Sequence, residues 1–70
     1  MKIEVSDEQV AAVIRALRDR IEKIGDTYTG SDIEDKEIGA LKEVAKSLGH
    51  TIVATTRASG FNIEVTKNDA

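Results

Sequence analysis

The chain has 70 residues, which is enough for one small domain over residues 1–70 and leaves no room for a second. It contains no cysteine, so disulfides and thiolate metal sites are excluded. A net charge of −3 and a sequence pI near 5.0 argue against non-specific binding to nucleic acid, which needs a positive electrostatic field.

The first residues predict a short strand that leads directly into a helix. In "KIEV" (residues 2–5) apolar and charged side chains alternate, which is typical of a strand. Ser6 and Gln9 then have the spacing of a capping box, in which each side chain hydrogen-bonds the backbone N–H of the other residue. The helix is therefore expected to begin at residue 7.

Residues 7–24 are predicted to form an amphipathic helix. Apolar residues recur every three or four positions and share one face: Val10, Val13, Ile14, Leu17, Ile21 and Ile24. Arg15 and Arg18 have acids at i,i+4, namely Asp19 and Glu22. Residues 18 and 20 lie roughly 200° apart around the helix, so we interpret these arginines and Arg20 as part of an ion-paired solvent face rather than a basic patch. Gly25 is predicted to end the helix in a left-handed conformation.

A second helix is predicted from residue 32, because Ser31 and Glu34 form another capping box. Gly49 is expected to close this helix. Gly39 lies inside it, where glycine costs about 1 kcal/mol relative to alanine, and we interpret this glycine as a point of close approach to a neighbouring helix. The apolar stripe of the helix consists of Ile38, Leu41, Val44, Ala45 and Leu48.

Two runs rich in β-forming residues predict a C-terminal hairpin. They are "TIVATTR" (residues 51–57) and "FNIEVT" (residues 61–66), and the short segment "ASG" separates them. The second run alternates cleanly between apolar and polar side chains, whereas Ile52 and Val53 of the first run are adjacent.

The register of this hairpin depends on the length of its loop. A loop of two or four residues places one set on the face of Phe61: Ile52, Ala54 and Thr56. A three-residue loop with a glycine bulge places the other set there: Val53 and Thr55. We favour the first register, because the small side chain of Ala54 leaves space for a packed helix.

These elements predict an α+β fold with the order β-α-α-β-β. Two antiparallel helices are expected to pack on one face of a small three-stranded sheet, because an isolated hairpin is only marginally stable and residues 2–5 can complete the sheet. The expected core lies beneath the sheet and consists of Val13, Leu17, Ile21, Leu41, Val44, Phe61 and Ile63.

We expect no catalytic, cofactor-binding or metal-binding residues, and therefore no enzyme and no cofactor. Residues 26–37 have the length of an EF-hand calcium loop, but Ser31 stands where that loop needs glycine. His50 is the only histidine and has no cysteine with which to form a dyad. Since no signal segment and no run of about 18 apolar residues is present, a cytoplasmic protein without membrane contact is expected.

The opening "KIEVSDEQV" resembles that of ribbon-helix-helix repressors, which share the order strand, helix, helix. The resemblance covers at most the first 50 residues and implies base reading by the outward strand residues, here Lys2 and Glu4. That family uses mostly basic or amide side chains there, has a shorter first helix and lacks the hairpin. A nucleic-acid-binding regulator, acting in this way or through the hairpin tip, is therefore kept as the alternative.

The leading expectation is a non-enzymatic protein–protein interaction module that binds a protein partner or a second copy as a homodimer. Only two aromatic residues and no covalent link support the core, so further apolar surface is expected to find a partner. The short, charged chain also resembles small phage and prophage proteins in style, and a phage-type accessory role fits that impression.

The expected partner-binding residues lie on and beside the hairpin tip: Arg57, Thr55, Ser59 and Val53. A projecting arginine can bind a carboxylate or a phosphate with two parallel hydrogen bonds. The other interpretation is that Arg57 only lies across Phe61 or pairs with Glu64, and the sequence leaves both open.

Overall fold

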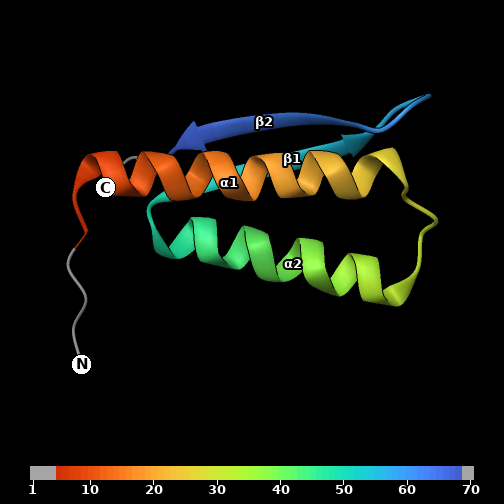
Figure 1. Cartoon of the computed structure of the whole chain (residues 1–70), viewed down its shortest axis with the longest axis horizontal. Helices are drawn as coiled ribbons and strands as arrows, with labels where there is room; N and C mark the ends of the chain where they lie inside the picture. The colour runs from red at the N-terminus through yellow and green to blue at the C-terminus, as the bar shows by residue number, and fades with distance from the viewer. Residues whose placement is uncertain (1–4, 69–70) are drawn as a thin grey trace.

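The computed structural model describes residues 5–68, which form two helices followed by a two-stranded antiparallel sheet (Figure 1). Helix α1 spans Asp7–Asp26 and helix α2 spans Asp32–Ser47. Strand β1 spans His50–Thr56 and strand β2 spans Phe61–Lys67. The two helices run antiparallel beside each other, with α1 against both strands and α2 against β1. The predicted α+β class is confirmed.

Both predicted capping boxes are present and fix where the helices begin. The Ser6 hydroxyl accepts from Gln9 N at 3.2 Å, and the Gln9 side chain accepts from Ser6 N at 2.8 Å. Ser31 and Glu34 repeat this exchange at the start of α2. Gly49 follows the end of α2, as predicted, and has the left-handed φ of +80° that is common just after a helix.

The structure confirms the favoured register of the hairpin. Thr56 pairs with Phe61, Ala54 with Ile63, and the loop between the strands has four residues. Ile52 is 4% exposed because it shares the inner face with Phe61, where both helices pack.

The predicted three-stranded sheet is wrong for the part of the chain that the structure describes, where the sheet has two strands and the order is α-α-β-β. Residues 1–4, which hold most of the predicted first strand, lie outside the described residues. Val5 belongs to no strand and is 47% exposed. The next residue, Ser6, is already the N-cap of α1, so Val5 is the one residue of the predicted strand that the structure describes.

The core lies between the helices and the inner face of the hairpin. Its buried members are Ile14, Ile21, Ile24, Ile38, Ala45, Ile52 and Phe61. Five predicted core residues are buried or pack against this cluster: Leu17, Ile21, Leu41, Phe61 and Ile63. The side of each helix that faces the core was therefore predicted correctly, although the most deeply buried positions of the helices are mainly isoleucines: Ile14, Ile21, Ile24 and Ile38.

The prediction of a core position is wrong for Val13 and Val44, which are 40% and 45% exposed. Two strands make a narrow sheet, so each helix buries only a narrow stripe of its surface against it. Val13 and Val44 lie outside those stripes.

Gly25 does not end α1, contrary to the prediction. The helix continues to Asp26, and Gly25 is buried with a negative φ. A Cβ atom at Gly25 would lie 2.7 Å from Cδ2 of Phe61, 2.9 Å from its Cγ and 3.0 Å from its backbone nitrogen. The glycine is therefore needed because the first residue of β2 packs directly on the helix backbone.

Gly39 has the opposite environment. It was predicted to allow close approach of another helix, yet no atom beyond its chain neighbours and its own helix backbone lies within 4 Å of the position that its Cβ would occupy, and the residue is exposed. Within the described chain, nothing explains the glycine at this position by packing.

We predict that Gly25→Ala lowers the free energy of unfolding by about 1–3 kcal/mol, because the added methyl group must displace both the ring and the backbone of Phe61. Chemical denaturation followed by circular dichroism measures this change.

Gly39→Ala is the matched control for that substitution. It should raise the free energy of unfolding by about 0.5–1 kcal/mol, since alanine favours the helix and meets open space there. If both substitutions stabilised the protein equally, the close contact between Gly25 and Phe61 would be refuted.

Candidate protein-binding surface

The outer face of the hairpin carries side chains that no helix of the described chain covers. Val53 lies opposite Glu64, and Thr55 lies opposite Asn62. Opposed residues of antiparallel strands point to the same face, and all four are exposed, Val53 at 48%. The hairpin thus presents a mostly polar surface with one half-exposed valine.

The tip of the hairpin is closed by hydrogen bonds that involve Arg57. Its backbone nitrogen donates to the carbonyl of Gly60 at 3.1 Å, and its Nε donates to the carbonyl of Ser59 at 3.0 Å. Gly60 has φ +86°, a conformation that side-chain-bearing residues rarely adopt. The arginine is therefore held at the crown of the loop by its own turn.

This contact differs from both intramolecular roles considered for Arg57. Among residues 5–68 it forms no ion pair with Glu64, and the ring of Phe61 packs instead on Tyr28, with centroids 5.0 Å apart at 58°. Nη1 and Nη2 of the guanidinium make no hydrogen bond to a described residue. These two groups are available to an external acceptor.

The end of α1 and the loop between the helices pack against the tip end of the hairpin. Asp26 Oδ1 lies 3.5 Å from the position of a Cβ on Gly60. Tyr28 stacks on Phe61, and its hydroxyl donates to Asp35 Oδ1 at 2.6 Å, which raises the pKa of the phenol. The tip, the interhelical loop and the first turn of α2 thus form one connected end of the molecule.

Glu34 locks this loop onto α2. Its carboxylate accepts from Thr29 N at 3.0 Å, from Thr29 Oγ1 at 2.7 Å and from the hydroxyl of Ser31 at 2.8 Å, besides the capping bond. These bonds, the Thr29 hydroxyl first, stabilise the ionised form and lower the pKa of Glu34 from 4.5 to about 2.

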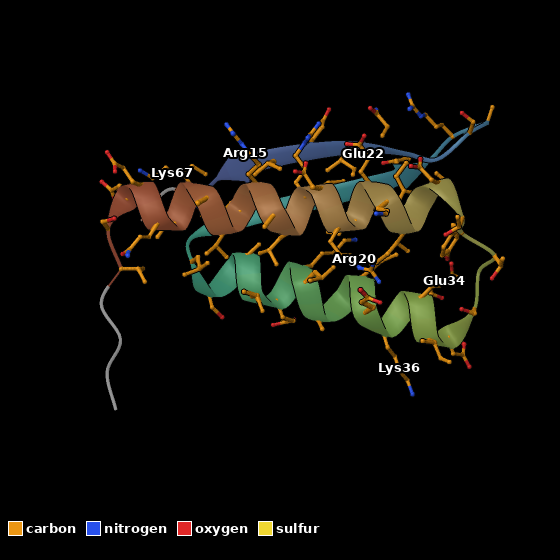
Figure 2. All side chains as sticks on the ribbon, viewed as in Figure 1. Arg15, Arg20, Glu22, Glu34, Lys36 and Lys67 are labelled. Atoms are coloured by element: carbon orange, nitrogen blue, oxygen red, sulfur yellow. The ribbon has the colours of Figure 1, made fainter. Side chains whose placement is uncertain are left out.

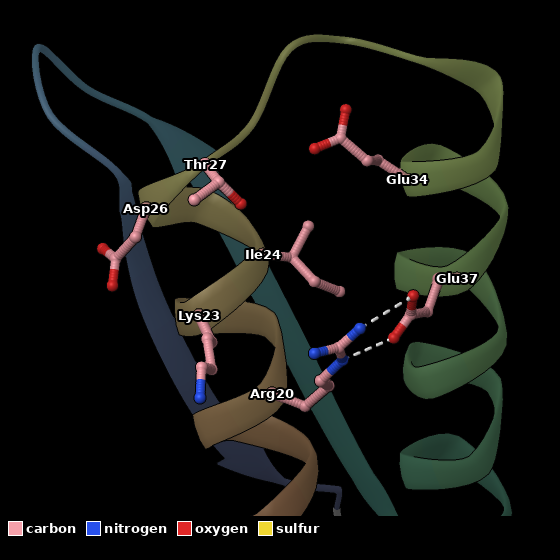
Figure 3. A pocket seen from close by; sticks show the side chains of 7 residues that line it. All are labelled: Arg20, Lys23, Ile24, Asp26, Thr27, Glu34 and Glu37. Atoms are coloured by element: carbon pink, nitrogen blue, oxygen red, sulfur yellow. Dashed lines mark hydrogen bonds and ion pairs between the residues drawn. The ribbon is translucent and has the colours of Figure 1, made fainter.

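A cleft of about 450 Å³ lies beside the same loop, between the last turns of α1 and the first turns of α2 (Figure 3). Arg20 and Glu37 face each other across it, with Nε 2.5 Å from Oε2 and Nη2 3.2 Å from Oε1. The bond raises the pKa of Arg20 and lowers that of Glu37. The remaining lining residues are Lys23, Ile24, Asp26, Thr27 and Glu34.

Two of the three arginines of α1 are ion-paired, and Arg15 forms no ion pair with a described residue. Arg18 lies 3.5 Å from Asp19 and 3.7 Å from Glu22. Arg20 points toward α2, whereas Arg15 projects from the opposite side of α1 (Figure 2). The three cations do not form one patch.

The predicted binding residues are contiguous in the structure. Val53 and Thr55 lie on the outer face, and Arg57 and Ser59 continue from them into the tip. Sequence reasoning did not include Asn62, which shares this surface. A four-residue loop pairs Asn62 with Thr55, so the favoured register could have predicted that Asn62 lies on the outer face.

Over residues 5–68, no cluster of three or more potential metal ligands was found, and no helix combines the length and apolar character needed to cross a membrane. No protein-family model matches the chain, and no curated protein or solved structure matches it significantly. Any function assigned to the hairpin surface must therefore be argued from its geometry alone.

We predict that Glu34 makes stability depend on acid. Its pKa is lowered on folding, so its stabilising contribution is complete above pH 4.5 and is lost as the pH falls from 4.5 toward about 2. Glu34→Gln should flatten this part of the stability curve, measured as the melting temperature at a series of pH values.

Glu64→Gln is the matched control, because it removes the same charge from an exposed carboxylate that makes no hydrogen bond or ion pair with residues 5–68. If the curve of Glu34→Gln coincided with those of the parent and the control, the carboxylate would not lock the loop.

Proposed function

We propose that this protein is a non-enzymatic binding module that recognises another protein through the outer face and tip of its hairpin. The observation that carries the proposal is Arg57, held at the crown of the loop by Ser59 while Nη1 and Nη2 point to no described partner. A positioned guanidinium binds a carboxylate with two parallel hydrogen bonds. A carboxylate of the partner protein is the ligand that this geometry favours.

The outer face is suited to lie against a protein surface. Val53 and Thr55 are β-branched, so their side chains have few rotamers to lose when a partner covers them. The hairpin backbone is already ordered by its pairing and by the contact of Phe61 with α1. Such preorganisation lowers the entropic cost of binding.

Charge supports a protein rather than a nucleic acid as the partner. Glu64 lies opposite Val53 on the outer face, where it would repel a phosphate backbone. Arg18 and Arg20 are engaged with acids of the chain itself. In a chain with a net charge of −3, Arg57 and Arg15 supply too little positive charge for the alternative of a nucleic-acid-binding regulator.

We predict that Arg57→Ala weakens partner binding at least about tenfold, a loss of about 1.4 kcal/mol, while the melting temperature stays nearly unchanged because the side chain is exposed. The parent chain is immobilised, and a bound protein is identified by quantitative mass spectrometry. That protein is then purified and titrated against each variant by calorimetry.

Lys36→Ala provides the matched control, since it also removes one exposed cation but projects from the far side of α2 (Figure 2). Val53→Asp tests the outer face independently and should weaken binding as well. Equal affinity of the parent, Arg57→Ala and Val53→Asp would rule out the hairpin as the contact surface.

A further inference from the structure

The two helices carry a second row of side chains that does not face the core. On α1 these residues follow a three-four-three spacing, and on α2 a four-three-four spacing, which keeps each row on one side of its helix. All are exposed except Glu37, which is intermediate. This outer helix face consists of Val13, Ala16, Arg20 and Lys23 from α1, and of Ile33, Glu37, Ala40 and Val44 from α2.

The bond between Arg20 and Glu37 sets the level at which the two rows meet. Val13 lies seven residues before Arg20, and Val44 lies seven residues after Glu37. Seven residues are about two turns, and the helices are antiparallel, so the two valines lie at one level. By the same reasoning, Ala16 lies near the level of Ala40.

Ile33 completes the pattern at the other end of the face. It is 79% exposed, the largest exposed fraction among the large apolar side chains of the described chain. It lies near the level of Lys23, one turn beyond the ion pair of Arg20 and Glu37. The face therefore has four successive levels along the helices: Val13 with Val44, Ala16 with Ala40, Arg20 with Glu37, and Lys23 with Ile33.

We propose that the outer helix face binds the same face of a second copy, with the two-fold axis parallel to the helices. Rotation about such an axis leaves the position of every residue along the helices unchanged. It places α1 of one copy antiparallel against α2 of the other. Val13 then meets Val44 of the second copy, and Ala16 meets its Ala40. This surface differs from the hairpin, so the inference goes beyond the proposed function and does not rest on it.

Charge complementarity identifies a second copy as the occupant. The axis places Arg20 of each copy beside Glu37 of the other, so the charges at that level alternate in sign around a square. An apolar partner would cover Arg20 and Glu37 without offering either of them a further opposite charge. A second copy offers a carboxylate to Arg20 and a guanidinium to Glu37. The charges on this face are therefore complementary to themselves.

The size of the side chains also fits helix pairing. Ala16 and Ala40 lie in the middle of the face, where small side chains let two helices approach closely. Val13 and Val44 are already about half covered, so a second copy can remove their remaining surface from water. The hairpin fits self-association less well, because Ile52 is 4% exposed and offers little apolar surface to a second copy.

The first experiment measures the mass of the full chain by analytical ultracentrifugation over a range of concentrations. We expect a reversible dimer of twice the 7.6 kDa monomer at high micromolar concentration. Val13→Glu and Val44→Glu should each shift the equilibrium toward monomer by at least about tenfold in the dissociation constant. Thr55→Glu, on the outer face of the hairpin, should leave the dimer unchanged.

Two further substitutions test the charged level. Arg20→Glu alone should give monomer, and Arg20→Glu combined with Glu37→Arg should restore the dimer, because the exchange recreates both the intramolecular and the intermolecular pairs. Circular dichroism verifies folding of every variant, and Val13→Asn replaces Val13→Glu if the latter unfolds.

Disulfide exchange tests the orientation, and the absence of native cysteine makes it specific. Ala16→Cys and Ala40→Cys are made in separate chains, mixed and oxidised. The mixed disulfide should form severalfold faster than either homodisulfide, since the axis places position 16 over position 40 of the other copy.

A parent chain that stays at 7.6 kDa at high micromolar concentration would overturn the proposal. A dimer that is lost in Thr55→Glu but retained in Val13→Glu would assign self-association to the hairpin and overturn it equally. Partner binding through Arg57 is measured with separate variants, so failure of this proposal and failure of the proposed function can be distinguished.

Discussion

The structure depends on the packing of one aromatic ring on one helix backbone. Phe61 opens β2 and lies directly on Gly25, near the end of α1, and its ring also packs against Tyr28. This contact joins residues far apart in the chain and brings the loop between the helices under the hairpin. The loop is in turn fixed to α2 by Glu34, so helices and strands meet at one end of the molecule.

Local signals in the sequence predict the elements of this fold well. Ser6 with Gln9 and Ser31 with Glu34 determine both helix starts, because their hydrogen bonds involve only neighbouring residues. The hairpin register likewise follows from the spacing between its apolar runs. The predicted hairpin surface around Arg57 is contiguous for the same reason.

The glycines show why the remaining features could not be predicted. Local rules predict that Gly25 stops the helix, whereas the glycine is needed because the ring of Phe61 packs against it. Gly39 suggested a close neighbour, yet it faces open space. Spacing alone does not distinguish a glycine that ends a helix from one that accommodates a distant side chain.

Both ends of the described chain lie at the same end of the molecule, opposite the hairpin tip (Figure 1). Asp7, His50 and Lys67 line one small cavity there. Anything joined to the chain before α1 or after β2 is thus attached on that side alone. A tether at either end would therefore leave the hairpin tip with Arg57 at the side of the domain farthest from the attachment.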